Sequence, residues 1–115
     1  MDGIVDLINK IRERPGVLLG RPSARTLHAF LSGYAYAHKG NEPGDYEFLA
    51  SFNQWVHERY ELTSSQGWAK IIEFYSPTEA EEMALFWKLF DEYLAERAAS
   101  RKQAPRRRSS ISAVP

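Results

Sequence analysis

The chain has 115 residues, enough for one domain with one hydrophobic core. Hydrophobic residues make up 43% of it and include three Trp, six Tyr and six Phe, so it can fold as a globule. The absence of cysteine excludes disulfide bonds and thiolate metal sites. The net charge of zero hides an asymmetry, because residues 1–100 carry ten Lys and Arg against fifteen Asp and Glu, whereas the last fifteen carry five basic residues and no acid. An acidic body with a basic tail favours an interaction protein over a catalyst.

The first predicted helix begins near residue 4 and ends at Pro15. Apolar residues recur in it with helical spacing, at Ile4, Leu7, Ile8 and Ile11. Asp2 is a candidate N-cap, and Pro15 should end the helix because the residue before a proline is driven out of the α region. For the apolar residues 17–19 that follow, an extended segment and a single helical turn both remain open.

Two further helices are predicted between residues 23 and 60, separated by a loop over 38–45. Ser23 is the expected N-cap of the first, and Gly33 within it is expected to allow a close helix crossing. Asp45 is the expected N-cap of the second. Their apolar stripes consist of Leu27, Phe30, Leu31 and Tyr34, and of Leu49, Phe52, Val56 and Tyr60.

The last two predicted helices are a short one around Trp68–Tyr75 and a long one ending near Arg97. Ser76-Pro77-Thr78-Glu79 predicts a capping box at the start of the long helix, with Ser76 as N-cap. The long helix has an unusually wide apolar surface, so it is either central in the bundle or partly devoted to a partner. The residues expected to form the core are Phe30, Tyr34, Phe52, Val56, Trp68, Ile72, Phe86, Trp87 and Phe90.

These patterns predict an all-α fold: a single-domain bundle of four or five short helices over residues 1–98. Residues 99–115 lack apolar periodicity and are rich in Ser, Arg, Gln and Pro, so we expect a disordered basic tail. No apolar run reaches the roughly 18 residues of a membrane span. The start of the chain does not have the pattern of a signal peptide, so a cytoplasmic protein is expected.

The sequence offers no catalytic constellation. His57-Glu58-Arg59-Tyr60-Glu61 lacks the second histidine, at i+4, that a zinc-protease helix needs. Neither a G-x-S-x-G nucleophile motif nor a glycine-rich phosphate loop occurs. We therefore expect no enzyme activity, no metal site and no cofactor.

Acidic and apolar residues suggest a surface for a protein partner. Carboxylates gather at the predicted starts of two helices, at Glu42, Asp45 and Glu47 and at Glu79, Glu81 and Glu82. If both starts lie on one side of the bundle, they form an acidic face, with Leu85, Leu89 and Phe74 as an apolar anchor. Such a face suits a basic partner, because charge steers the encounter and a buried apolar centre prolongs it. Alternatively, the acids only complement helix dipoles and the leucines lie in the core.

The basic tail carries a second hypothesis. Its charges are Arg101, Lys102, Arg106, Arg107 and Arg108. They could contact nucleic acid or an anionic membrane surface, and the two serines after Arg108 could be a phosphorylation site that cancels the charge. A tail that only improves solubility is the alternative.

Four segments together resemble a family of small bacterial proteins. They are RPGVLLG at 14–20, FLSGY at 30–34, WVHERY at 55–60 and GWAKIIEFYS at 67–76, followed by an acidic aromatic helix. Some members of that family are encoded near polymorphic toxins, and the resemblance therefore implies an immunity role. It spans about residues 14–94 and carries no catalytic residues. Two functions remain open: a protein-binding domain, such as an immunity-type inhibitor of a basic toxin, or a regulatory or nucleic-acid-associated module acting through the tail.

Overall fold

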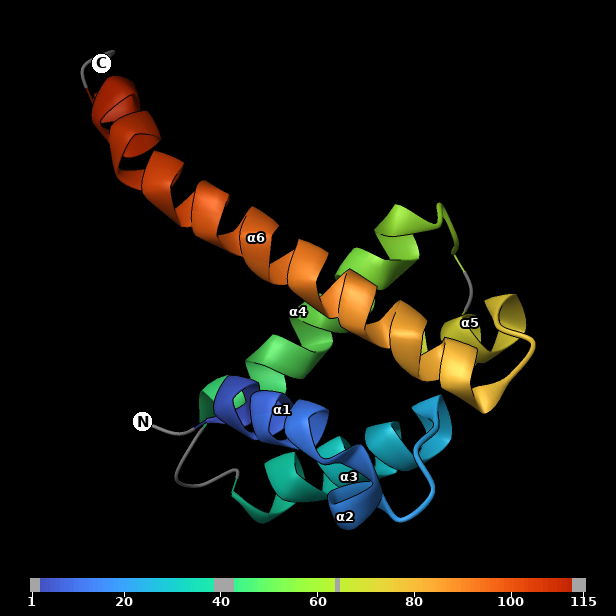
Figure 1. Ribbon diagram of the computed structural model, residues 1–115. Helices are drawn as coiled ribbons and strands as arrows, with labels where there is room; N and C mark the ends of the chain where they lie inside the picture. The colour runs from blue at the N-terminus through green and yellow to red at the C-terminus, as the bar shows by residue number, and fades with distance from the viewer. Residues whose placement is uncertain (1–2, 39–42, 64, 113–115) are drawn as a thin grey trace.

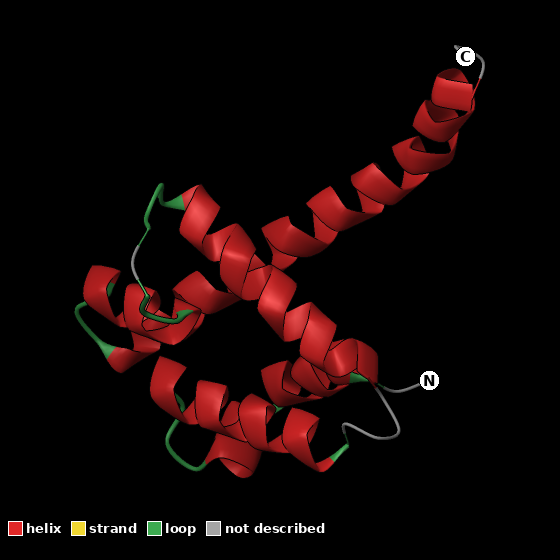
Figure 2. Ribbon diagram, turned by 180° about the vertical axis from the view of Figure 1, so that it is seen from behind, coloured by secondary structure: helices red, strands yellow, loops and turns green. Residues whose placement is uncertain are grey.

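In the computed structural model the chain folds into helices joined by short loops (Figures 1 and 2). The structure describes residues 3–38, 43–63 and 65–112, with side chains for 3–38, 44–63 and 65–100. This part of the chain contains no strand. Its six helices are α1 (Ile4–Glu13), α2 (Pro15–Leu19), α3 (Ala24–Ala37), α4 (Pro43–Arg59), α5 (Trp68–Tyr75) and α6 (Glu79–Ser112). The predicted all-α class is confirmed. Among the described residues, no helix is long and apolar enough to cross a membrane.

The additional helix is α2, which forms where the sequence left two conformations open. Arg14 leaves the helical region with φ −143° and ψ 69°, as a residue before proline should, and α1 ends there. Pro15 then starts α2 at the first helical position, where its missing N–H costs nothing. Residues 17–19 are therefore a helical turn rather than a strand.

The start of α3 follows the sequence prediction and adds a distant partner. Ser23 is the N-cap, its hydroxyl accepts from the Thr26 amide at 3.1 Å, and Thr26 completes the capping box. The amide of Ala24, which no group within α3 can satisfy, donates to a carboxylate oxygen of Glu82 at 2.9 Å. Glu82 thus joins the start of α3 to the first turn of α6.

The role predicted for Asp45 is wrong. The helix it was expected to cap begins two residues earlier, at Pro43, so Asp45 lies inside the first turn of α4. There it is 4% exposed, and its Oδ1 accepts from the backbone amide of Ile4 at 3.1 Å. Asp45 therefore supplies the cap of α1, whose own N-cap residue Gly3 has no side chain to offer. The other candidate for that role, Asp2, lies outside the described residues.

The predicted cap of the long helix is displaced by two residues. Helix α6 begins at Glu79, and the Thr78 hydroxyl accepts from the Glu81 amide at 3.1 Å and donates to the Glu81 carboxylate at 2.9 Å. Thr78 is therefore the N-cap instead of Ser76. The segment contains two possible N-cap residues, Ser76 and Thr78. Ser76 instead ends α5, where its backbone amide donates a hydrogen bond to the Glu73 carbonyl.

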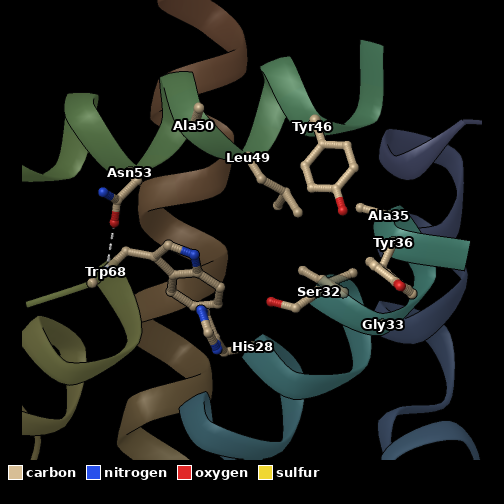
Figure 3. A pocket seen from close by; sticks show the side chains of 12 residues that line it. His28, Ser32, Gly33, Ala35, Tyr36, Tyr46, Leu49, Ala50, Asn53 and Trp68 are labelled. Atoms are coloured by element: carbon tan, nitrogen blue, oxygen red, sulfur yellow. Dashed lines mark hydrogen bonds between the residues drawn. The ribbon is translucent and has the colours of Figure 1, made fainter. Parts of the chain in front are cut away.

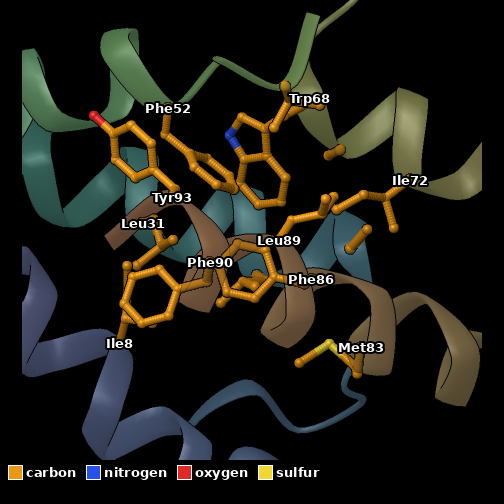
Figure 4. Close-up of a cluster of buried hydrophobic side chains, with 14 of the residues drawn as sticks. Ile8, Leu31, Phe52, Trp68, Ile72, Met83, Phe86, Leu89, Phe90 and Tyr93 are labelled. Atoms are coloured by element: carbon orange, nitrogen blue, oxygen red, sulfur yellow. The ribbon is translucent and has the colours of Figure 1, made fainter. Parts of the chain in front are cut away.

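Helix α6 crosses the body, and its apolar side forms the centre of the core (Figures 1 and 4). Aromatic rings from three helices meet there. The ring centroid of Phe86 in α6 lies 5.7 Å from that of Phe52 in α4 and 5.2 Å from that of Trp68 in α5. The most completely buried large side chains are Phe52, Phe86, Phe90, Ile8, Ile11, Leu27, Leu31, Ile72, Leu89 and Val56. The wide apolar surface of α6 is thus explained mainly by its central position.

Three residues predicted for the core are only half-buried. Phe30, Tyr34 and Trp87 pack against the core from its edge, whereas the other six predicted residues are buried. Trp87 lies at the rim because α1 covers this side of α6 with the guanidinium of Arg12, 5.0 Å from the ring centroid. Arg12 also donates two 2.8 Å hydrogen bonds to Asp91, which hold the pKa of that carboxyl below its ordinary value.

Beyond the body, α6 continues as a helix to Ser112, through the boundary expected at residue 98. Both views show this end projecting away from the other helices. Arg, Lys, Gln and Ala are good helix formers, so the sequence after Ala98 can extend α6 without tertiary contacts. Such an unsupported stretch is only marginally stable, and Pro105 removes one of its backbone hydrogen bonds. That the tail is disordered and separable from the body in solution therefore stays our prediction.

Candidate functional site

The structure does not bring the predicted acidic residues together on one face. Helix α4 begins beside the end of α3, whereas α6 begins beside the start of α3 (Figure 1). Because α3 has 14 residues, these two points are separated by about 20 Å. In the first group Asp45 is buried and Glu47 is exposed, and Glu42 lies outside the described residues.

The acids at the start of α6 are used within the molecule. Glu79 forms an ion pair with Arg21 at 2.8 Å, Glu81 bonds the Thr78 hydroxyl, and Glu82 accepts from the Ala24 amide. These contacts join α6 to the segment before α3 and complete two helix starts. The alternative that these carboxylates serve helix ends explains their positions without a partner.

The three apolar residues of the predicted anchor also lie in different environments. Leu89 is 1% exposed and belongs to the core, so it cannot contact a partner of the folded chain. Leu85 is half-buried. Phe74 is 81% exposed and borders a hollow of about 200 Å³ next to Tyr75 and Leu62. The sequence could not separate Leu85 from Leu89, because both flank the apolar stripe of α6.

The tail residues are not placed by side-chain contacts. The projecting end of α6 contains all five basic residues of the tail, Arg101, Lys102, Arg106, Arg107 and Arg108. The structure describes their backbone but not their side chains. Their contact with nucleic acid remains a prediction from charge.

A groove that the sequence did not reveal runs between α3 and α4 (Figure 3). It has a volume of about 710 Å³ and is open to solvent. Leu31 and Ala35 of α3 and Leu49 of α4 form its floor, and Tyr36 and Tyr46 stand at one end. The other end is bordered by His28, Asn53, Gly67 and Trp68. No lining residue has a permanently charged side chain.

Small residues at facing positions leave this space open. Ser32 and Gly33 of α3 face Ala50 of α4 across it. A methyl group built on Gly33 would meet no atom within 4 Å, so the expectation that Gly33 permits a close helix crossing is wrong. The groove depends on how α3 and α4 are placed relative to each other. The sequence showed the apolar stripe of each helix but not this placement.

Trp68 joins the groove to the core. It is 3% exposed, and its ring contacts Phe52 and Phe86. Its backbone amide donates to Asn53 Oδ1 at 2.8 Å, which fixes the start of α5 against α4. Among the described residues the indole N–H has no acceptor, and Figure 3 shows the nitrogen on the side of the ring that faces the space between α3 and α4. This N–H is not fully buried, so water or a ligand in the groove can accept a hydrogen bond from it.

The histidines do not form a metal site in the described part of the chain. The Nδ1 atoms of His38 and His57 lie 2.9 and 2.8 Å from the carbonyl oxygens of Tyr34 and Asn53, one helical turn earlier. His28 is exposed and lies edge-on to Trp68 at 5.5 Å. No group of three or more potential ligands occurs among these residues.

Comparisons of the chain with family models, with curated proteins and with solved structures give no match.

Proposed function

We propose that this chain is a non-enzymatic protein-binding domain that receives its partner in the groove between α3 and α4. The observation that carries the proposal is the groove itself, with an apolar floor, tyrosines at one end and the unpaired Trp68 N–H at the other. Aromatic residues are enriched in protein interfaces, and antibody binding surfaces combine Tyr and Trp, which offer large contact areas with few rotatable bonds, with Ser, Gly and Asn, which offer adaptable polar contacts.

This proposal differs from one based on an acidic face. Glu79 is paired with Arg21, and Glu81 and Glu82 are held by hydrogen bonds at two helix starts, so the positions of these acids need no partner protein to explain them. The immunity-type role and binding of a basic toxin remain predictions from the resemblance. The proposal keeps the expected cytoplasmic setting, which a chain without cysteine permits.

Site-specific photocrosslinking in the native host tests the proposal. A benzophenone amino acid would replace Ser32, which lines the groove, or Lys88, which is exposed on α6 outside it. We expect one discrete protein adduct from position 32 that position 88 does not give. The second variant Ala50→Arg should block the groove and abolish the adduct, while circular dichroism shows an unchanged fold. Identical adducts from both positions, or an adduct that survives Ala50→Arg, would exclude the groove.

A further inference from the structure

The Trp68 end of the groove adjoins a second hollow with a different charge. This hollow measures about 170 Å³ and shares His28 and Gly67 with the groove. Its remaining lining residues are Arg25, Ala69, Lys70 and Glu73. Two basic side chains therefore stand at the end of an uncharged groove, against one acid.

The two basic residues are not neutralised by neighbours. Arg25 and Lys70 are exposed, and neither has an ion-pair partner among the residues that the structure describes. Helix α5 also begins here, after Gly67, and a helix start carries a partial positive charge. Glu73 offsets part of this charge, and the hollow retains an excess of positive groups.

Helix α5 closes this end of the groove, because it packs on both α3 and α4. A polypeptide that enters between Tyr36 and Tyr46 and follows the groove therefore meets α5 next to the hollow, where it either ends or turns out to solvent. If it stops with its amino terminus, its positive charge meets Arg25, Lys70 and the start of α5. If it stops with its carboxyl terminus, its negative charge meets the same groups favourably.

From this geometry we infer that the groove binds the free C-terminus of a partner protein, with the terminal carboxylate between Arg25 and Lys70. This inference rests on the proposed function and names the part of the partner that binds. Arg25, His28, Ser32 and Tyr36 follow one face of α3 over about 16 Å, the length of roughly five extended residues. The Trp68 N–H then donates to a backbone carbonyl, and apolar side chains rest on Leu49. Capture of a terminal carboxylate is an established form of peptide recognition.

The test uses an array of random hexapeptides attached through their N-termini, each made with a free carboxylate and with an amidated end, and probed with the labelled full chain. We expect free-acid peptides to bind and their amides to bind about 10-fold or more weakly, since hydrogen bonds to charged groups are the strong ones. The strongest peptide is then titrated by fluorescence anisotropy. Arg25→Glu and Lys70→Glu should each weaken it about 10-fold or more, and the matched charge reversal Lys88→Glu should not.

Trp68→Phe keeps an aromatic ring but removes the N–H, and should weaken the same peptide about 5-fold. Equal binding of acid and amide would overturn the inference while the groove could still bind peptide chains. Binding of no peptide, or equally strong binding of the short fatty acid decanoate, would also overturn it. The crosslinking experiment decides the proposed function separately.

Discussion

Helix α4 has two faces with opposite surroundings. Towards α6 it carries Phe48, Phe52 and Val56, which are buried among the rings of Phe86 and Phe90. Towards α3 it carries Tyr46, Leu49 and Ala50, which line an open groove. The comparison shows that the size of the facing residues decides whether two packed helices close the space between them. Phenylalanines close it on one side, and Ser32 and Gly33 leave it open on the other.

The largest effect should come from emptying the closed side. Phe86→Ala removes a ring that contacts Phe52, Trp68 and Phe90, and should lower the free energy of unfolding by about 3–5 kcal/mol. Urea unfolding of the full chain measures this loss. A variant that unfolds at the parent's midpoint would show that the rings around α6 do not form the main core.

Trp68→Phe separates the two sides at the residue that touches both. The smaller ring still reaches the core, so we expect a loss of about 1–2 kcal/mol in urea unfolding. Trp68→Ala should cost about 3–5 kcal/mol, because it also empties the core side. Equal losses for the two variants would mean that the ring contributes little to the core.

Gly33→Ala should stabilise the chain, because the groove has room for the methyl group. Alanine has a higher helix propensity than glycine, and we expect an increase of about 0.5–1 kcal/mol in the free energy of unfolding. Thermal unfolding checks the sign. A decrease would show that α3 and α4 lie closer together than the groove allows. Ala35→Gly, at a buried position of the same helix, should destabilise instead.

The smallest effect concerns the pair at the edge of the core. Arg12 lowers the pKa of Asp91, so the folded state favours the ionised carboxylate. This stabilisation is complete above about pH 4, the ordinary range of Asp, and is lost as pH falls through the lower pKa of the folded state. The pair is exposed, so Asp91→Asn should cost less than about 1 kcal/mol at pH 7. In urea unfolding at pH 2 the difference from the parent should shrink, and a difference that stays constant would contradict this assignment.

Features that depend on local sequence were predictable. The Ser23 cap, the break at Pro15 and the helix Trp68–Tyr75 follow from residues within one or two turns. The cap of α6 was misplaced by two residues because Ser76 and Thr78 both fit the local pattern, and the role of Asp45 was missed because its partner comes from elsewhere in the chain. Asp45 looked like a cap for its own helix because nothing near it in sequence shows that Ile4 lies beside it.

The candidate site was the least predictable part. Small residues such as Ser32 and Ala50 are common on exposed helix faces, and they define a groove only after α3 and α4 have been placed side by side. The acidic residues predicted for the partner surface were easy to identify in the sequence. Of those that the structure describes, all except Glu47 form hydrogen bonds or an ion pair within the molecule. Trp68 appeared as a core residue, which is correct, but its N–H could not be assigned to a surface from the sequence.

Two carboxylates that complete helix starts far away in the chain also set an order of events during synthesis. The Ile4 amide has its hydrogen-bond acceptor in Asp45, 41 residues later in the chain, and the Ala24 amide has its acceptor in Glu82, 58 residues later. As the chain leaves the ribosome, α1 and α3 emerge long before these acceptors, so their first amides stay bonded to water. The first amide of α1 therefore finds its acceptor only after the start of α4 has emerged, and that of α3 only after the start of α6 has emerged.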